Sequence, residues 1–386
     1  MQGPLALVMS GGGARAAYQV GFLRAVARAH PDLRFPIITG VSAGAINAAH
    51  LAAHPGPFVD AVEDLVRLWD SLTMDRVFEL DGRHLILNAF RWGLQLASGG
   101  IFGKPGIRSL VDTSPLQRFL GDALGDDAGA IPGIVENIRT GRLDALAITT
   151  SSYSKGRSVT WVQGAKAWQW SRPQRHAQSA SIGVDHVMAS SAIPLFFPAV
   201  AIEGEWYGDG GIRFSAPLSP ALHLGAKRVL AISTRFDRSV VVEELESDLE
   251  YPPPAQVIGS MMNSIFLDLL DQDAWRVETM NRLLEKVEIS DRGDFQVVQL
   301  LTLRPSEDLG RLARDFEQSL PRFFRFLMRG LGTRETTSPD VLSFLLFEPR
   351  YLRLLMEIGE RDGEARMSQV NALLGASDPS HRPRSE

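Results

Sequence analysis

The chain has 386 residues, 45% of them hydrophobic and 22% charged, which is enough length and apolar content for a large folded core. Its formal net charge of −5 excludes the overall basic character that nucleic-acid binding requires, so we expect no nucleic-acid partner. The absence of cysteine excludes disulfides, thiolate metal sites and a cysteine nucleophile.

The N-terminus carries no targeting signal that we recognise. Its first ten residues lack a basic segment and pass directly into glycines, so we expect no signal peptide. No uninterrupted apolar run reaches the roughly 18 residues that a membrane-spanning helix requires. We therefore expect a cytoplasmic protein, with peripheral contact at a membrane as an open alternative.

The N-terminal half alternates short apolar runs with helical patterns. Residues 5–9 predict a buried strand, and residues 18–29 follow with helical spacing. A second strand at 36–39 is followed by an alanine-rich helix over 43–53. Such repeated strand, turn and helix units are typical of an α/β fold. Further apolar runs that predict strands are residues 144–149, 158–162 and 229–233.

Three segments are expected along the chain. Residues 1–240 form an α/β domain, in which about 57–132 read as a helical cap. Residues 241–375 read as a mainly helical C-terminal region that begins with a proline-rich break and contains one strand-like run at 295–303. Residues 376–386 are polar with two prolines, which predicts a disordered tail.

Ser42 is the candidate nucleophile. It lies in the pattern Gly-x-Ser-x-Gly between the predicted second strand and the following helix. A serine that attacks a carbonyl must stand at a sharp strand-to-helix turn, where only small neighbours fit. Gly40 and Gly44 supply those neighbours.

A triple glycine follows the first predicted strand, at Gly11, Gly12 and Gly13. Backbone N–H groups at such a turn can stabilise a developing oxyanion. Arg15 has two interpretations, since its guanidinium can hold the loop in shape or neutralise a lipid phosphate. The same loop satisfies a dinucleotide-binding pattern, but Asp32 lies before the second strand instead of at its end, which argues against that reading.

Asp209 is the candidate base, in the run Gly208-Asp209-Gly210-Gly211. Gly210 and Gly211 would let another loop approach without obstruction. Read alone, however, Asp-Gly is a common turn signal.

Four motifs occur in a fixed order: Gly11 to Arg15, Gly40 to Gly44, Ala189 to Pro194, and Asp209 to Gly211. In this order they resemble the patatin-like phospholipase family, over roughly residues 4–235. One departure is Ala16, where the family usually has glycine. The resemblance implies a three-layer α/β/α core with a central, mostly parallel sheet, and a helical extension that the family does not define.

The resemblance also implies the chemistry. It predicts a Ser42–Asp209 dyad, an oxyanion hole at Gly11 to Gly13, and esterase or phospholipase A activity on lipid or phospholipid substrates without metal or other cofactor. A histidine-dependent triad would need His223 or His381, and neither has a convincing context.

Several alternatives stay open. The chain can be a lipid-binding protein without turnover, or an effector whose C-terminal helices gate the lipase; its oligomeric state is undetermined. A segment at 320–331 combines three arginines with phenylalanines and predicts either an interfacial helix or an amphipathic helix packed on the core. Trp161, Trp168 and Trp170 predict either a membrane anchor or aromatic residues of an edge strand and the core.

Overall fold

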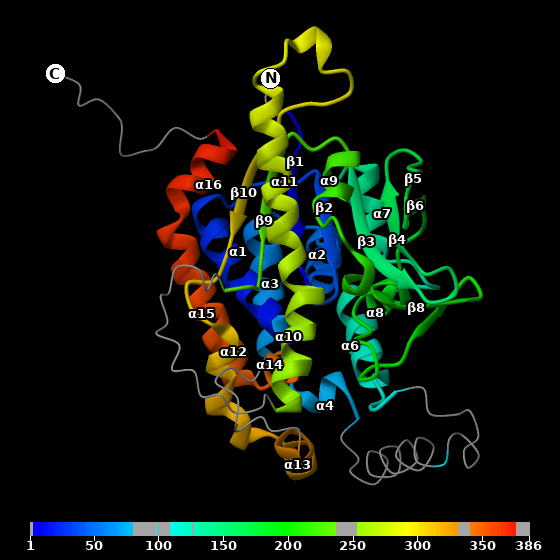
Figure 1. The fold of residues 1–386 in the computed structure, drawn as a ribbon, viewed down its shortest axis with the longest axis vertical. Coiled ribbons are helices and arrows are strands. Elements are labelled where there is room, and N and C mark those ends of the chain that lie inside the picture. Colours follow the sequence, from blue (N-terminus) through cyan, green and yellow to red (C-terminus); the bar gives the residue numbers. More distant parts are fainter. Residues whose placement is uncertain are drawn as a thin grey trace, which may run out of the picture.

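The computed structural model describes residues 3–79, 98, 109–125, 127–236, 253–330 and 340–375. In these ranges a ten-stranded mixed sheet runs through the centre of the molecule, and helices cover both of its faces (Figure 1). The expected α/β class with a mostly parallel core sheet is confirmed.

The core of the sheet is parallel. Its order is β10-β9-β1-β2-β3-β4-β6-β5, and every neighbouring pair from β10 to β3 is parallel. Beyond β3 the pairing is mixed, and β8 also pairs antiparallel with β3. The strands are β1 (Leu5–Met9), β2 (Ile37–Val41), β3 (Ala145–Ser152), β4 (Arg157–Gly164), β5 (Trp170–Arg172), β6 (Arg175–Ser179), β7 (Val200–Ile202), β8 (Glu205–Asp209), β9 (Arg228–Ile232) and β10 (Gln299–Leu303).

Helices connect and cover these strands. In the N-terminal part they are η1 (Gly13–Ala16), α1 (Ala17–Ala29), α2 (Ala43–Ala53), α3 (Phe58–Asp70), α4 (Met74–Val77), α6 (Ser114–Leu124), α7 (Pro132–Arg139), α8 (Val184–Ser190), η2 (Gly210–Arg213) and α9 (Ser219–His223). In the C-terminal part they are α10 (Pro254–Phe266), α11 (Asp268–Leu284), η4 (Ile289–Asp291), α12 (Leu309–Leu312), η5 (Ala313–Ser319), α13 (Arg322–Gly330), α14 (Asp340–Leu345), α15 (Pro349–Ala365) and α16 (Met367–Leu374).

The central strands are apolar throughout because both of their faces are covered. In β1, Leu7 and Met9 point into one hydrophobic cluster, with α1, α2 and α15. The alternate residues Ala6 and Val8 point into a second cluster, with α9 and α11. Alternating side chains of one buried strand thus serve two separate layers, which is why the sequence shows a continuous apolar run.

The C-terminal region is mainly helical, as expected, and it also extends the sheet. β10 pairs in parallel with β9, and starts later than the predicted run 295–303. α15 packs closely on α1 because Gly21 and Gly359 leave room at the contact. A side chain at either position would collide with the backbone of the other helix. Tyr18 in α1 also donates a hydrogen bond to Asp362 (3.0 Å). The domain boundary near residue 240 stays a prediction from the sequence.

Part of the expected cap is described. Its described residues form α3, α4 and α6, whereas residues 80–97, 99–108 and 126 lie outside the described residues. The predicted disordered tail, 376–386, also lies outside them.

The arginine-rich segment forms α13 and is partly packed. Phe324 is buried, with its ring centroid 5.8 Å from that of Phe78, and Arg329 pairs with Glu317 at 3.0 Å. Phe326 is exposed. These contacts favour the packed reading of this helix.

The tryptophans are also packed. Trp161 is fully buried and donates a hydrogen bond to Thr150 (2.9 Å), while Trp168 and Trp170 pack against the second cluster. Within the described ranges, no helix combines the length and apolarity needed to cross a bilayer.

Candidate active site

Ser42 occupies a strained turn between β2 and α2. Its backbone has φ 55° and ψ −136°, a conformation that residues with a side chain rarely adopt. The turn is possible because Gly40 and Gly44 have no side chains. A side chain on Gly44 would collide with the carbonyl groups of Met9 and Ser10, and a side chain on Gly40 would collide with the carbonyl group of Gly44. The turn has the geometry of a nucleophile elbow, as its sequence predicts.

Ser42 donates a hydrogen bond from Oγ to Oδ2 of Asp209, and the two atoms are 2.6 Å apart. Asp209 is the last residue of β8, which pairs with the end of β3, itself a neighbour of β2. Sheet pairing therefore brings together two residues that are 167 positions apart in the sequence. The Gly211 N–H donates to the other carboxylate oxygen of Asp209 at 2.8 Å, and Gly210 and Gly211 begin η2.

Burial changes the acidity of Asp209. Its side chain is completely enclosed, and desolvation raises the pKa of this carboxyl from 3.8 to about 7, against the opposing effect of the hydrogen bonds from Ser42 and Gly211. A base with a pKa near neutrality accepts a proton more readily than an ordinary aspartate does. Burial thus makes this carboxylate more basic than that of an unperturbed aspartate.

The glycine loop lies next to the serine. An added Cβ on Gly11 would stand 2.9 Å from Cβ of Ser42. Gly12 and Gly13 have φ of 145° and 55°, values that side chains disfavour. Within the described part of the chain, the N–H groups of Gly11 and Gly12 donate to no protein acceptor. These two donors thus have no protein acceptor in the described part of the chain and belong to the loop beside Ser42.

Two further serines hold Ser42 in place. Ser190 Oγ accepts a hydrogen bond from the Ser42 N–H (3.0 Å) and donates to the Thr149 carbonyl (2.7 Å), and Ser191 Oγ donates to the Ser42 carbonyl (3.0 Å). Both belong to the Ala189 to Pro194 motif, whose role was not assigned from the sequence. The motif is therefore a support for the backbone of the elbow.

A buried hydrogen-bond chain supports the glycine loop. Trp69 donates to Asn47 (2.7 Å), Asn47 donates to Gln19 (3.0 Å), and Gln19 donates to the Ser10 carbonyl (2.9 Å). Thr234, just after β9, donates to the Gly11 carbonyl (2.7 Å). No sequence motif marked these residues, because their common role appears only where α1, α2 and α3 meet the ends of β1 and β9.

Arg15 is buried. Its guanidinium donates to Ser343 (2.7 Å) and to Asp340 (2.6 Å), both in α14. Of the two interpretations from the sequence, the structure places Arg15 in contacts that hold the loop.

A histidine-dependent triad would use His223 or His381. His223 bonds within its own helix and stacks on Trp170, with ring centroids 4.8 Å apart, as expected for a packed residue. His381 lies outside the described residues. Among the described residues, no histidine is hydrogen-bonded to Ser42 or Asp209, and no group of three or more histidine, aspartate or glutamate side chains is placed to hold a metal ion.

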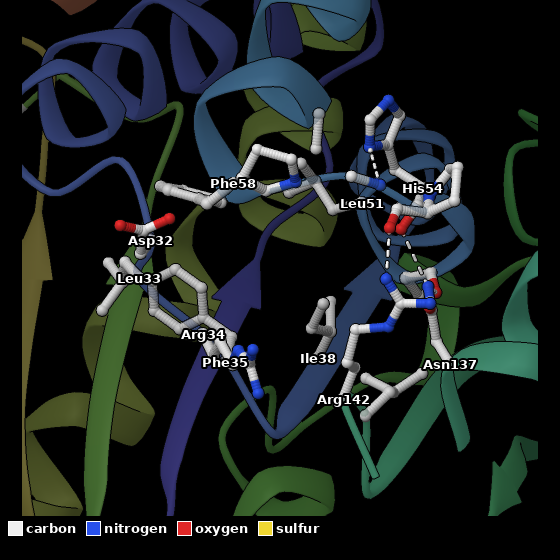
Figure 2. A pocket seen from close by; sticks show the side chains of 16 residues that line it. Asp32, Leu33, Arg34, Phe35, Ile38, Leu51, His54, Phe58, Asn137 and Arg142 are labelled. Carbon is white, nitrogen blue, oxygen red and sulfur yellow. Dashed lines mark hydrogen bonds between the residues drawn. The ribbon is translucent and has the colours of Figure 1, made fainter. Parts of the chain in front are cut away.

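A cavity of about 300 Å³ lies at the opposite end of β2 from Ser42. Figure 2 shows its apolar wall, with Phe35, Ile38 and Phe58, and Arg142 on the other side. Because its lining comes from the loop before β2 and the loop after α2, it does not include the Ser42–Asp209 pair. We assign it no part in chemistry at Ser42.

The fold and the site define an α/β protein in which a serine hydroxyl is held against a buried carboxylate at the carboxyl ends of parallel strands. The sequence model named Patatin-like phospholipase matches residues 7–222, more than half of the chain. The chain belongs to the patatin-like phospholipase family, and this membership supports a lipid-hydrolase function.

Comparison with solved structures finds matches of low sequence identity. VipD from Legionella pneumophila is 14% identical with a TM-score of 0.41, over 96% of this chain and 67% of that one. Human GIVD cytosolic phospholipase A2, in complex with methyl gamma-linolenyl fluorophosphonate, is 14% identical with a TM-score of 0.45, over 96% of this chain and 59% of that one. The chain therefore spans less than two thirds of the human protein. A search of curated protein sequences finds no match.

Proposed function

We propose that this protein is a serine acyl hydrolase that cleaves carboxylic esters of lipids, with phospholipase A, lysophospholipase or lipase activity. The observation that carries the proposal is the 2.6 Å hydrogen bond from Ser42 Oγ to Asp209, at a serine held in a strained elbow. The family match to Patatin-like phospholipase supports the lipid substrate class.

In the proposed mechanism Asp209 is ionised and accepts the proton of Ser42 as Oγ attacks the ester carbonyl. The N–H groups of Gly11 to Gly13 bind the tetrahedral oxyanion. The proton passes to the leaving alcohol, and the acyl group stays on Ser42. A water molecule then attacks the acyl-enzyme, with Asp209 again as base, and releases the fatty acid. The proposed steps involve neither a histidine nor a metal ion.

The test is incubation with a total lipid extract, followed by mass spectrometry. We expect the wild-type protein to release fatty acid together with a lysophospholipid or a free alcohol, and Ser42→Ala to release neither. Loss of neutral esters alone would assign lipase activity, and lysophospholipid would assign phospholipase A activity. An unchanged extract with the wild-type protein would favour a lipid-binding role without turnover.

A gated lipase is a second candidate, favoured by burial of the reacting groups. Ser42 is 2% exposed and Asp209 is not exposed at all, so a lipid ester reaches Oγ only after the site opens. Addition of phospholipid vesicles should then increase the turnover of a short-chain nitrophenyl ester. The same rate with and without vesicles would argue against gating by an interface. Peripheral contact with a membrane belongs to this proposal.

A further inference from the structure

The only side-chain contacts described for the Arg15 guanidinium come from the C-terminal third of the chain, outside the family match. Nε donates to Ser343 Oγ at 2.7 Å, Nη2 donates to Asp340 Oδ1 at 2.6 Å, and the ring of Phe344 lies 4.7 Å below the guanidinium carbon. Arg15 is 3% exposed and Asp340 8% exposed. A motif residue at the start of the chain is thus neutralised by a carboxylate 325 positions later.

Asp340 is itself fixed from two further directions. Asn263 of α10 donates to its second carboxylate oxygen at 2.8 Å, and Ser343 donates to its backbone carbonyl at 2.6 Å. Figure 1 shows α14 beside α10 and α12, on the side of the molecule where α4 and α13 also lie. The position of the carboxylate is therefore fixed by contacts other than the one with Arg15.

The backbone of α14 also touches the glycine loop directly. A side chain on Gly13 would collide with the carbonyl of Phe344. Arg15 lies in the same short 3₁₀ turn as Gly13, so the contacts of its guanidinium fix the turn that continues the glycine loop.

The environment of Arg15 is unsuited to a lipid phosphate. The guanidinium already has a carboxylate partner, and the adjacent cavity of about 220 Å³ is lined by Asp268, Asp308 and Asp340 as well as by a second arginine, Arg235. Arg235 is itself paired with Asp268 at 2.8 Å, so the carboxylates outnumber the arginines in the lining and oppose the binding of a phosphate. Arg15 is best explained by its contact with α14.

We propose that Asp340 is a positioning residue for the oxyanion loop: through Arg15 it holds the Gly11 to Gly13 N–H groups against Ser42, which makes α14 part of the catalytic unit. This inference rests on the proposed acyl-hydrolase function. Removing one partner of a buried ion pair leaves an uncompensated charge, so the loop must rearrange to hydrate Arg15.

The test compares Asp340→Asn with Glu307→Gln. Asparagine keeps the shape and an acceptor oxygen but removes the charge. Glu307 forms an exposed pair with Arg361 at 2.8 Å in the same third of the chain, and serves as the matched control. With a short-chain nitrophenyl ester we expect Asp340→Asn to lower kcat by about 10- to 100-fold, up to the ~100-fold loss typical of a missing oxyanion donor, with little change in KM. Asp340→Glu should recover part of kcat, and the control should match the wild type.

Hydrogen exchange gives a readout that does not need turnover. Asp340→Asn should increase amide exchange in residues 11–16 at least several-fold, while β2 and β3 keep their protection. If the wild-type protein fails to cleave esters, the proposed function fails, and exchange still decides whether Asp340 holds the loop.

Two results would overturn the inference. One is unchanged kcat and unchanged exchange in residues 11–16. The other is faster exchange throughout the chain with a parallel loss of folded protein, which would make Asp340 a general stabilising residue. If Asp340→Asn does not fold, Asp340→Glu keeps the charge but displaces the carboxylate from its place beside Arg15. It should then lower kcat more than the control does; a rate equal to the control would refute the inference.

Discussion

Replacing Asp209 with asparagine tests whether the buried carboxyl lowers the free energy of unfolding while being required for ester cleavage. The pKa of this group is raised from 3.8 to about 7 by complete desolvation. Well below pH 3.8 the carboxyl is protonated in both the folded and the unfolded chain, so its ionisation does not change the free energy of unfolding. As the pH rises from 3.8 to 7, the unfolded chain loses the proton and the folded chain keeps it, so folding stability falls. Above pH 7 the loss is complete.

The size of this effect follows from the same pKa change. Each tenfold change in acidity corresponds to ~1.4 kcal/mol, so the ionisable carboxyl costs about 2 kcal/mol at pH 5 and about 4 kcal/mol at pH 8. Asparagine avoids this cost. The stability of Asp209→Asn relative to the wild-type protein should therefore rise by about 2 kcal/mol between pH 5 and pH 8, whatever other contacts the substitution changes.

The assay is urea unfolding followed by tryptophan fluorescence at both pH values, together with turnover of a nitrophenyl ester. Asp209→Asn should be inactive at both. Exposed Asp144 offers a control, because water hydrates its side chain in both states and Asp144→Asn should shift stability little. A stability difference that is the same at pH 5 and pH 8, or an active Asp209→Asn protein, would refute the assignment of Asp209 as a buried base.

Two other expectations follow from the site. The kcat/KM of ester cleavage should fall about tenfold for each pH unit below about 7, because only ionised Asp209 accepts the serine proton; a profile that is flat down to pH 5 would contradict this. Ser190→Ala should lower the free energy of unfolding by about 1–3 kcal/mol, since it leaves the Ser42 N–H without its side-chain acceptor, and should reduce ester turnover. Urea unfolding and nitrophenyl ester kinetics measure both effects, and Ser190→Ala with wild-type values in both would show that the elbow does not depend on Ser190.

Local features of the site could be predicted because they depend on neighbouring residues. Strand β1 and helix α2 have the predicted bounds, since an apolar run ended by glycines and an alanine-rich segment specify their conformation over a few residues. The strained turn at Ser42 likewise follows from the small residues around it.

Long-range features required the folded chain. Asp209 read by itself is a turn residue, and its position beside Ser42 depends on β8 pairing with β3. The partner of Arg15 lies in α14, where no motif points to it. The strand-like run in the C-terminal region gave no indication that β10 would extend the central sheet beside β9.

The sequence alone determined the strand–turn–helix units and the fold class, and it singled out Ser42 and Gly11 to Gly13 as candidate site residues, because these features depend on backbone geometry and apolar spacing within one segment. Tertiary structure decided the contact between Ser42 and Asp209, the raised pKa of Asp209, and the pairing of Arg15 with Asp340. Each of these depends on burial and on distances between segments that are far apart in the chain, and such distances are set only when the sheet and its two helical layers pack together.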